Sequence, residues 1–416
     1  MAILKPFKGI RPVPELAEKI ASRPYDVLNS EEARVEAEGN PYTFLHVAKP
    51  EIDLDPTIDT HTMPVYLKAK ENFESMVSKG WMFQDTEKCY YIYSQTMWGK
   101  TQYGLVGGAG VSDYMEGIIK KHELTRPDKE EDRMNHVRTA NINAEPVFFA
   151  YRDHETIDRI VAHKVKEKPV YDVTTPDEVN HKLWVIDDMQ TISDIEHIFE
   201  TEIPYLYVAD GHHRTAAAAR VGDEKKRNNK RHTGDEEYNF FLSVNFPASQ
   251  LRIIDYNRVV KDLNGMNADA FIKKLEAGFT VEMQGSIEFK PAKLREFSMY
   301  LEGNWYKLTA KQGTYDDNDP IKALDVTILT EQVLMPLLDI KDLRTSNRID
   351  FVGGIRGLGE LKKRVDSGEM KAAFALFPVS MKQLMDIADN DLIMPPKVTW
   401  FEPKLRSGLV VHSLSE

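Results

Sequence analysis

The residues best suited to chemistry form one short run, Asp210-Gly-His-His-Arg214, between an alternating apolar segment and an alanine-rich one. The alternation over 205–208 predicts a β-strand, and the alanines from 216 onward predict a helix. The run therefore stands at a helix N-terminus, where unpaired N–H groups and the helix dipole favour an anion such as phosphate. The predicted nucleotide- or phosphate-binding residues are Gly211, His212, His213 and Arg214.

The carboxylate of Asp210 directly precedes this predicted anion site. A negative group beside a phosphate is favourable only if it orients a histidine, holds a metal ion or accepts a proton from a substrate hydroxyl. Asp210 is therefore a candidate catalytic residue and a candidate metal ligand. The alternative interpretation is that the histidines merely cap the helix and that one ring packs on the core.

A second candidate pair, His122 and Glu123, lies in an irregular stretch just before Pro127, which is suited to the first position of a helix. A carboxylate next to an imidazole in a loop is a candidate general base. Such pairs are also common on protein surfaces, so both interpretations stand.

The chain ends with a segment rich in proline, lysine and aromatic residues at 394–405. It forms either a rigid terminus packed on the body of the protein or a wall of the substrate site. In the second case Lys397, Thr399 and Lys404 are candidate substrate or phosphate contacts, and His122 is a further one.

The elements around these residues indicate an α/β protein. Strands are predicted over 89–96 and 103–111, and the glycines at 104–110 lack the Gly-Lys-Ser/Thr of a phosphate loop, so a closely packed strand is expected there. Short strands are also predicted over 43–47 and 162–165. The predicted domains are an N-terminal region, 1–266, which contains the catalytic core, and a C-terminal α/β domain, 267–416, whose tail returns to the active site.

Composition limits the partners that this protein can have. Its 54 basic and 66 acidic residues give a net charge of -12, which disfavours nonspecific nucleic-acid binding. A single cysteine, Cys89, is consistent with a reducing compartment. Because no apolar run approaches the roughly 18 to 20 residues of a membrane span, and no signal-peptide core opens the sequence, a soluble cytoplasmic protein is expected.

The sequence resembles a large bacterial and archaeal family of unknown function. Three features carry the resemblance together: the 210–214 motif, the His122-Glu123 pair, and the segment Met-Pro-Pro-Lys-Val-Thr-Trp-Phe-Glu-Pro-Lys-Leu at 394–405. That family is similar to free L-serine kinases, which convert L-serine to O-phospho-L-serine with ADP or ATP, and more distantly to the ParB/sulfiredoxin-like proteins. The resemblance implies an α/β fold with a ParB/sulfiredoxin-like nucleotide-binding core built on a mixed sheet.

The resemblance also implies roles for residues. The 210–214 motif would handle the nucleotide phosphates, and Glu123 would be the catalytic base. The implied activity is that of a nucleotide-dependent phosphotransferase that uses ATP or ADP with Mg2+ and acts on a small hydroxyl metabolite, such as L-serine. Two alternatives remain: a ParB-type nucleotide-binding regulator without kinase activity, and a protein that binds a metabolite without turnover.

Overall fold

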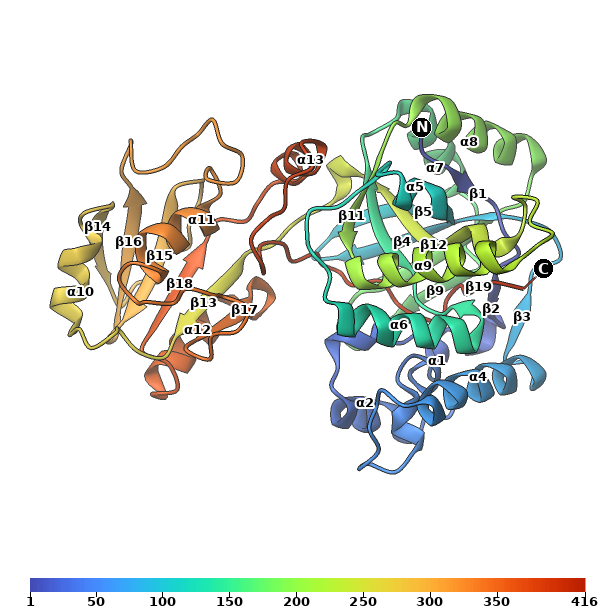
Figure 1. Ribbon diagram of the computed structural model, residues 1–416, viewed down its shortest axis with the longest axis horizontal. Helices are drawn as coiled ribbons and strands as arrows, with labels where there is room; N and C mark the ends of the chain where they lie inside the picture. Colours follow the sequence, from blue (N-terminus) through green and yellow to red (C-terminus); the bar gives the residue numbers. More distant parts are fainter. Residues whose placement is uncertain (416) are drawn as a thin grey trace. The chain divides into compact units, whose positions relative to one another are not determined.

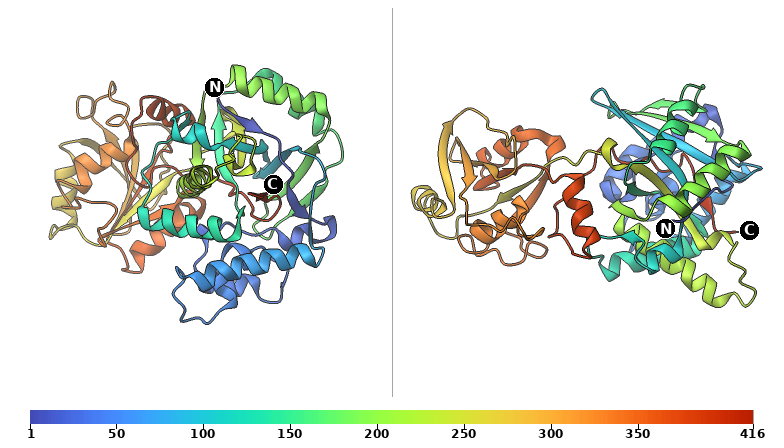
Figure 2. Two further views of the ribbon diagram at one scale, coloured as in Figure 1. Left: turned by 45° about the vertical axis from the view of Figure 1, so that its right-hand side comes forward. Right: turned by 90° about the horizontal axis from the view of Figure 1, so that it is seen from above.

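The computed structural model describes residues 1–415 and separates into two units (Figures 1 and 2). Unit 1 combines Met1–Leu251 with the segment from Pro403 onward, and unit 2 is Arg252–Glu402. The predicted boundary at residue 266 falls inside unit 2, because β13 (Tyr256–Val260) pairs with two strands of that unit. The end of the chain belongs to unit 1, so unit 2 is an insertion in unit 1.

Unit 1 is built on a mixed nine-stranded sheet. Most neighbouring strands are antiparallel, whereas β12 and β8 are parallel and so are β11 and β6. The α/β class with a mixed sheet is therefore as predicted. The order across the sheet is β6 (Ile119–Lys120), β11 (Leu206–Asp210), β8 (Val147–Tyr151), β12 (Phe240–Pro247), β5 (Lys100–Gly110), β4 (Tyr90–Met97), β10 (Asn180–Ile186) and β9 (Tyr171–Thr174), with β1 (Leu4–Lys5) paired to β5.

Helices pack on this sheet and form two main apolar clusters with it. In the larger cluster, α5, α7, α8 and α9 contribute buried side chains that meet those of the sheet. The second cluster joins α1, α3, α4 and the end of α6 to Val411 of the final segment. The helices of unit 1 are α1 (Ala17–Ile20), α2 (Ser30–Ala37), α3 (Leu45–Ala48), α4 (Met63–Ser78), α5 (Val111–Met115), α6 (Pro127–Ala140), α7 (Glu155–Lys164), α8 (Met189–Glu202) and α9 (His212–Asn228).

The end of the chain is an integral part of unit 1. Strand β19 (His412–Ser413) pairs with β7 (Ile142–Asn143), and Ser407 forms a β-bridge with Ser22. A further strand pair joins β2 (Ile10–Pro12) to β3 (Met82–Gln84). The N-terminus and the last described residues therefore both lie in unit 1, as Figures 1 and 2 show.

The glycine-rich segment 104–110 is strand β5, as predicted, and not a phosphate loop. Its glycines allow neighbouring side chains to come close: a Cβ at Gly104 would lie 2.5 Å from Cγ1 of Val244 on the adjacent strand. A Cβ at Gly107 would lie 2.8 Å from Leu4. The absence of side chains at these positions is thus a requirement of packing.

Two predicted strands are helices instead. The segment predicted as a strand over 43–47 includes most of α3, and the one over 162–165 is the end of α7. In α7, Ile157, Ile160 and Val161 are spaced three and four residues apart and pack into the larger cluster. This helical spacing puts them on one buried face, and the helix continues into the segment predicted as a strand.

Unit 2 has its own antiparallel sheet and its own core. The strand order is β14 (Phe279–Gly285), β16 (Asn304–Ala310), β15 (Glu296–Leu301), β18 (Ala372–Leu376), β13 and β17 (Ile349–Gly353). Leu361 of α12 packs on Val259, Tyr300 and Trp305 of this sheet. The helices are α10 (Ala268–Leu275), α11 (Asp325–Leu329), α12 (Gly357–Asp366) and α13 (Met381–Asp389).

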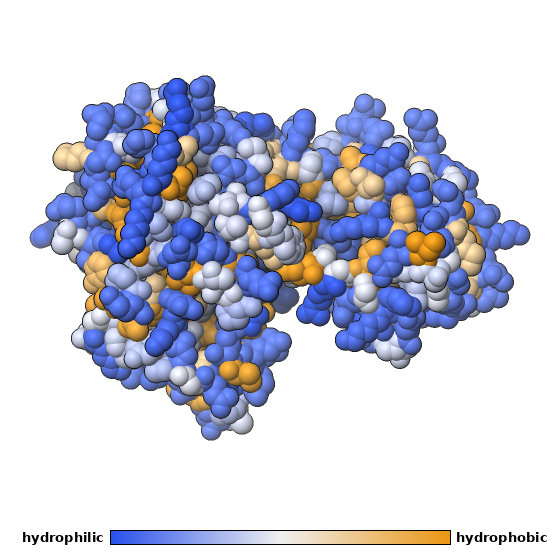
Figure 3. Space-filling view, turned by 180° about the vertical axis from the view of Figure 1, so that it is seen from behind, coloured by the Kyte–Doolittle hydropathy of each residue, from blue (hydrophilic) through white to orange (hydrophobic). Residues whose placement is uncertain are grey.

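Hydrophilic residues dominate the face of each unit that Figure 3 shows, with apolar residues between them. Across residues 1–415, none of the helices combines the length and the apolar character that a bilayer-spanning helix needs.

Candidate functional site

Parallel strand pairing brings the two predicted motifs together. Strands β6 and β11 run side by side in the same direction, with Lys120 opposite Tyr207. The carboxyl ends of parallel neighbours lie at the same edge of a sheet. His122 and Glu123 follow β6, and Gly211 follows β11, so residues almost ninety positions apart meet at one sheet edge.

Helix α9 starts at this edge, directly after β11. Gly211 is its N-cap residue and has a φ of 89°, a left-handed conformation that glycine adopts without strain. The Gly211 carbonyl accepts hydrogen bonds from the Thr215 N–H and from Thr215 Oγ1, both at 2.9 Å. The N-cap residue, Gly211, has no side chain that could cap the helix, and the positive end of a helix favours an anion.

The imidazole rings of His122 and His212 meet edge to face beside the helix start. Their centroids are 4.5 Å apart and the planes are inclined by 89°. Nδ1 of His212 lies 3.8 Å from Oε2 of Glu123, whose side chain is 43% exposed. Burial lowers the pKa of His122 to about 4. Burial also lowers the pKa of His212, and the nearby His122 lowers it further. Both rings are therefore neutral at pH 7.

Asp210 is held by two cations. Lys404 Nζ lies 3.2 Å from Asp210 Oδ2, and Arg214 Nη2 lies 3.7 Å from the same oxygen. Burial alone would raise the pKa of Asp210, but Lys404 and Arg214 outweigh it and hold that pKa below its ordinary value. Asp210 is thus ionised, and Lys404, from the predicted tail segment, is beside it.

His213 connects the helix start to the loop before α6. Its Nε2 accepts a hydrogen bond from the Arg126 N–H at 3.0 Å. Burial lowers the pKa of His213, although Glu130 opposes this. The neutral ring therefore carries its proton on Nδ1, and its acceptor nitrogen already has a partner.

Arg214 points into unit 1. Its side chain is 8% exposed, and Nη1 donates to the Pro146 carbonyl at 2.9 Å. Nη2 also lies 3.6 Å from Asp26 Oδ2. The sequence predicts that Arg214 binds phosphate. In this structure its guanidinium contacts Asp210 and the carbonyl of Pro146, which precedes β8.

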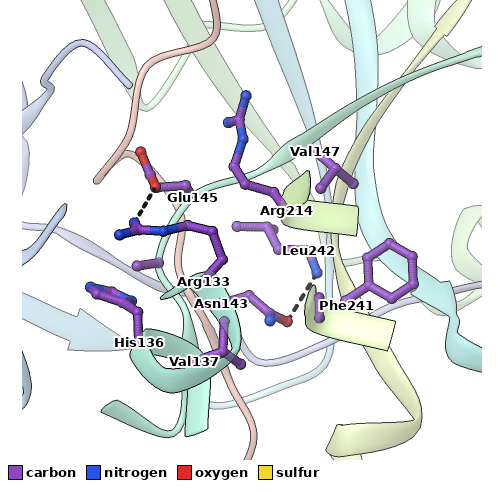
Figure 4. A pocket seen from close by; sticks show the side chains of 11 residues that line it. Arg133, His136, Val137, Asn143, Glu145, Val147, Arg214, Phe241 and Leu242 are labelled. Carbon is purple, nitrogen blue, oxygen red and sulfur yellow. Dashed lines mark hydrogen bonds and ion pairs between the residues drawn. The ribbon is translucent and has the colours of Figure 1, made fainter. Parts of the chain in front are cut away.

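A cavity of about 30 Å3 lies behind Arg214. Figure 4 shows Arg133, Glu145 and Arg214 among the side chains that line it. Glu145 accepts from the Tyr25 N–H at 2.9 Å and from Ser407 Oγ at 3.2 Å, and burial raises its pKa despite Arg214 and Arg133. A cavity of this size holds about two water molecules, far below the several hundred Å3 of a ligand pocket.

The sequence analysis did not predict Asp26, Arg133, Glu145 or Pro146 as site residues, although all four surround Arg214. They come from three separate places in the chain, with Glu145 and Pro146 adjacent, and no local spacing links these places. Of the candidates in the tail, Lys404 lies at the site, whereas Lys397 and Thr399 belong to unit 2. The Lys397 carbonyl there accepts a hydrogen bond from Arg258 at 2.8 Å.

Several solved structures resemble parts of this chain, at low similarity. A mutant free serine kinase in complex with AMP is 12% identical, with a TM-score of 0.36, and the match covers 74% of this chain and 92% of the kinase. A conserved hypothetical protein from Pyrococcus furiosus is 15% identical, with a TM-score of 0.34, and the match covers 74% and 97% of the two chains.

A C-terminally truncated SbnI from Staphylococcus aureus is 11% identical, with a TM-score of 0.32, over 71% of this chain and 82% of SbnI. No curated protein matches this sequence. The model of one protein family matches residues 4–327, which is most of the chain. The chain therefore belongs to the family described as "Protein of unknown function (DUF1015)", as the motifs predicted.

Proposed function

We propose that this protein is a nucleotide-dependent phosphotransferase that acts on a small hydroxyl metabolite, with free L-serine as the first candidate. The observation that carries the proposal is the meeting of Glu123 with the start of α9, where its carboxylate lies 3.8 Å from His212. Phosphoryl transfer needs positioned phosphates, neutralised charge and a group that accepts the hydroxyl proton. This sheet edge offers residues for each need.

The first backbone N–H groups of α9 bind the transferred phosphate in this proposal. Gly211 allows a phosphate to approach the backbone because it has no side chain. Lys404 adds a positive charge next to Asp210. Arg214 acts indirectly, since its buried guanidinium holds the Asp210 carboxylate in place.

Glu123 is the proposed general base. Its side chain is partly exposed, so an acceptor hydroxyl can reach it, and the neutral His212 ring orients it. The proton of the acceptor hydroxyl passes to a Glu123 oxygen as the hydroxyl oxygen attacks the terminal phosphorus. The bond from that phosphorus to the bridging oxygen breaks, and the nucleotide leaves one phosphate shorter. Asp210, on the phosphate side, remains ionised.

Mg2+ is the metal that this reaction class implies. Mg2+ prefers oxygen ligands and in nucleotide sites uses one or two carboxylates together with the phosphates. The ionised Asp210 fits this donor set, and both of its cationic neighbours approach through Oδ2. Bound there, Mg2+ would neutralise charge on the nucleotide phosphates.

The proposal is tested by incubating the purified protein with Mg-ATP or Mg-ADP and a panel of hydroxy amino acids, with mass-spectrometric detection of phosphorylated products. We expect Glu123→Gln to lower turnover by about 100-fold or more while nucleotide affinity, measured by calorimetry, changes only a few-fold. Glu131→Gln is the matched control, because this exposed carboxylate on α6 pairs only loosely with Arg138, at 3.6 Å.

Two results would overturn the proposal. The first is a protein that neither binds a nucleotide nor transfers phosphate to any acceptor on the panel. The second, which concerns the base alone, is a Glu123→Gln variant with the turnover of the wild type.

A further inference from the structure

Three side chains with metal-binding atoms converge at the sheet edge. His122, Glu123 and His212 each offer one ligand atom, and these atoms all lie within 4.8 Å of one another. The three residues come from two places in the sequence, the loop after β6 and the first residue of α9. Parallel pairing of β6 with β11 fixes the distance between those places.

The burial of the two imidazoles is a second, independent indication of a ligand. His122 is 1% exposed and His212 is 7% exposed. Within residues 1–415, neither nitrogen of His122 makes a hydrogen bond of ordinary geometry. Buried polar atoms nearly always have a partner, and those that lack one need an explanation such as an ion.

We propose that His122, Glu123 and His212 bind one divalent transition-metal ion of the Zn2+ class. Two imidazoles and one carboxylate are a common donor set for Zn2+, and such three-ligand sites leave a fourth position for water or substrate. Mg2+ and Ca2+ prefer oxygen ligands, so they are not suited to this cluster.

The cluster requires a small contraction to bind such an ion. Ligand atoms around a tetrahedral Zn2+ with bonds of about 2.0 to 2.2 Å lie roughly 3.3 to 3.6 Å apart. Nδ1 of His212 and Oε2 of Glu123 are already 3.8 Å apart. Glu123 lies in the irregular loop between β6 and α6 and is partly exposed, so its carboxylate can move toward the two imidazoles.

Two other residues with metal-binding atoms, His213 and Asp210, lie nearby but contact other groups. The proposed site is therefore separate from the Mg2+ position proposed at Asp210. His213 accepts the Arg126 N–H through Nε2. Asp210 has Lys404 at 3.2 Å and Arg214 at 3.7 Å.

The test uses the full chain after treatment with a chelator, with Co2+ as a spectroscopic substitute for Zn2+. We expect visible d–d bands that saturate at one Co2+ per chain and are abolished by added Zn2+ but not by a large excess of Mg2+. X-ray absorption at the zinc edge should show two imidazoles on the bound ion. Far-UV circular dichroism checks that each variant is folded.

Variants of the ligands should weaken binding selectively. Glu123→Gln and His212→Ala should lower the Co2+ affinity by about 10-fold or more, whereas His213→Ala, a variant of the adjacent histidine outside the cluster, should retain it. Equal affinities in all four proteins, or no d–d bands in the wild type, would overturn the proposal. If His212→Ala does not fold, Glu123→Gln and the absorption edge of the wild type decide the question.

One consequence rests on the proposed function. A Zn2+ ion on Glu123 occupies the lone pair that the proposed base uses, so Zn2+ should inhibit phosphate transfer by the wild type. The Co2+ titration contains no nucleotide, so a protein without transferase activity can still bind the metal. The two proposals therefore fail independently.

Discussion

At the scale of single residues, Arg214 belongs to a motif that predicts contact with a ligand. In the folded protein its side chain is buried inside unit 1. Its guanidinium donates to the Pro146 carbonyl and lies within 3.7 Å of both Asp26 and Asp210. Removing one partner of a buried charged cluster leaves the other charges uncompensated. Arg214 should therefore matter for stability at least as much as for binding.

We expect Arg214→Ala to lower the free energy of unfolding by about 3 to 5 kcal/mol, measured by urea denaturation at pH 7. Arg126→Ala is the control, since its side chain is 70% exposed and pairs with the exposed Asp128. That control should change stability by less than about 0.5 kcal/mol. An Arg214→Ala variant with unchanged stability and weakened nucleotide binding would instead make Arg214 a direct phosphate contact.

His181 is a second residue whose partners come from the fold. Arg406 Nε donates to its Nε2 at 3.4 Å, and Nδ1 lies 2.7 Å from the Tyr93 hydroxyl. Burial, together with the charge of Arg406, lowers the pKa of His181 to about 3. The ring is neutral, and a proton on Nε2 would face the Arg406 guanidinium.

This lowered pKa makes stability depend on pH. Between the ordinary histidine value of 6.5 and about 3, the unfolded chain binds a proton that the folded chain does not. Stability therefore falls as the pH falls through this window. We expect His181→Gln to reduce the slope of unfolding free energy against pH by up to about 1.4 kcal/mol per pH unit. Urea denaturation of the wild type and the variant at pH 7, 6 and 5 measures this slope. Equal slopes in the two proteins would contradict the prediction.

At the scale of elements, the junction between β11 and α9 depends on the backbone of Gly211. Its φ is 89°, and an added Cβ would lie 3.1 Å from Arg214 Nε. Gly117 has a similar φ of 77° and nothing within 4 Å of an added Cβ. Both glycines thus adopt a left-handed backbone conformation, but only at Gly211 would an added Cβ contact another side chain.

We expect Gly211→Ala to destabilise the protein by about 1 to 3 kcal/mol, and by more than Gly117→Ala does, because the alanine adds a clash with Arg214 to the backbone strain. Thermal and urea unfolding of both variants measure the difference. If the two substitutions cost the same, the contact between Gly211 and Arg214 does not contribute, and the helix start is less tightly packed than the structure indicates.

At the scale of the whole molecule, unit 2 is inserted into unit 1, and its two ends pair with each other. Ile253 and Phe401 form an antiparallel bridge, and the Ile254 N–H donates to the Trp400 carbonyl at 2.9 Å. An inserted unit whose ends are adjacent and whose core is its own can fold alone.

We expect residues 252–402 to unfold cooperatively when produced alone, as followed by circular dichroism in urea. A chain in which Leu251 is joined to Pro403 through a short Gly/Ser linker should also fold, because it retains β19 and the buried final segment. Loss of cooperative unfolding in both proteins would show that the two units depend on each other.

The sequence alone determined features that depend on neighbouring residues. The glycine-containing strand β5, the start of α6 at Pro127 and the passage from β11 into α9 were all predicted from local patterns. Strand or helix remained ambiguous for short apolar runs, so α3 and the end of α7 were predicted wrongly.

Only the tertiary structure decided which of these local features meet. The parallel pairing of β6 with β11 brings Glu123 to His212, and the return of the tail brings Lys404 to Asp210. The Pro146 carbonyl holds Arg214 inward. Strand pairing across such separations is set by the packing of the whole sheet, and no local spacing encodes it. The motifs thus indicate which groups can react, and the fold determines which of them lie within reach of one another.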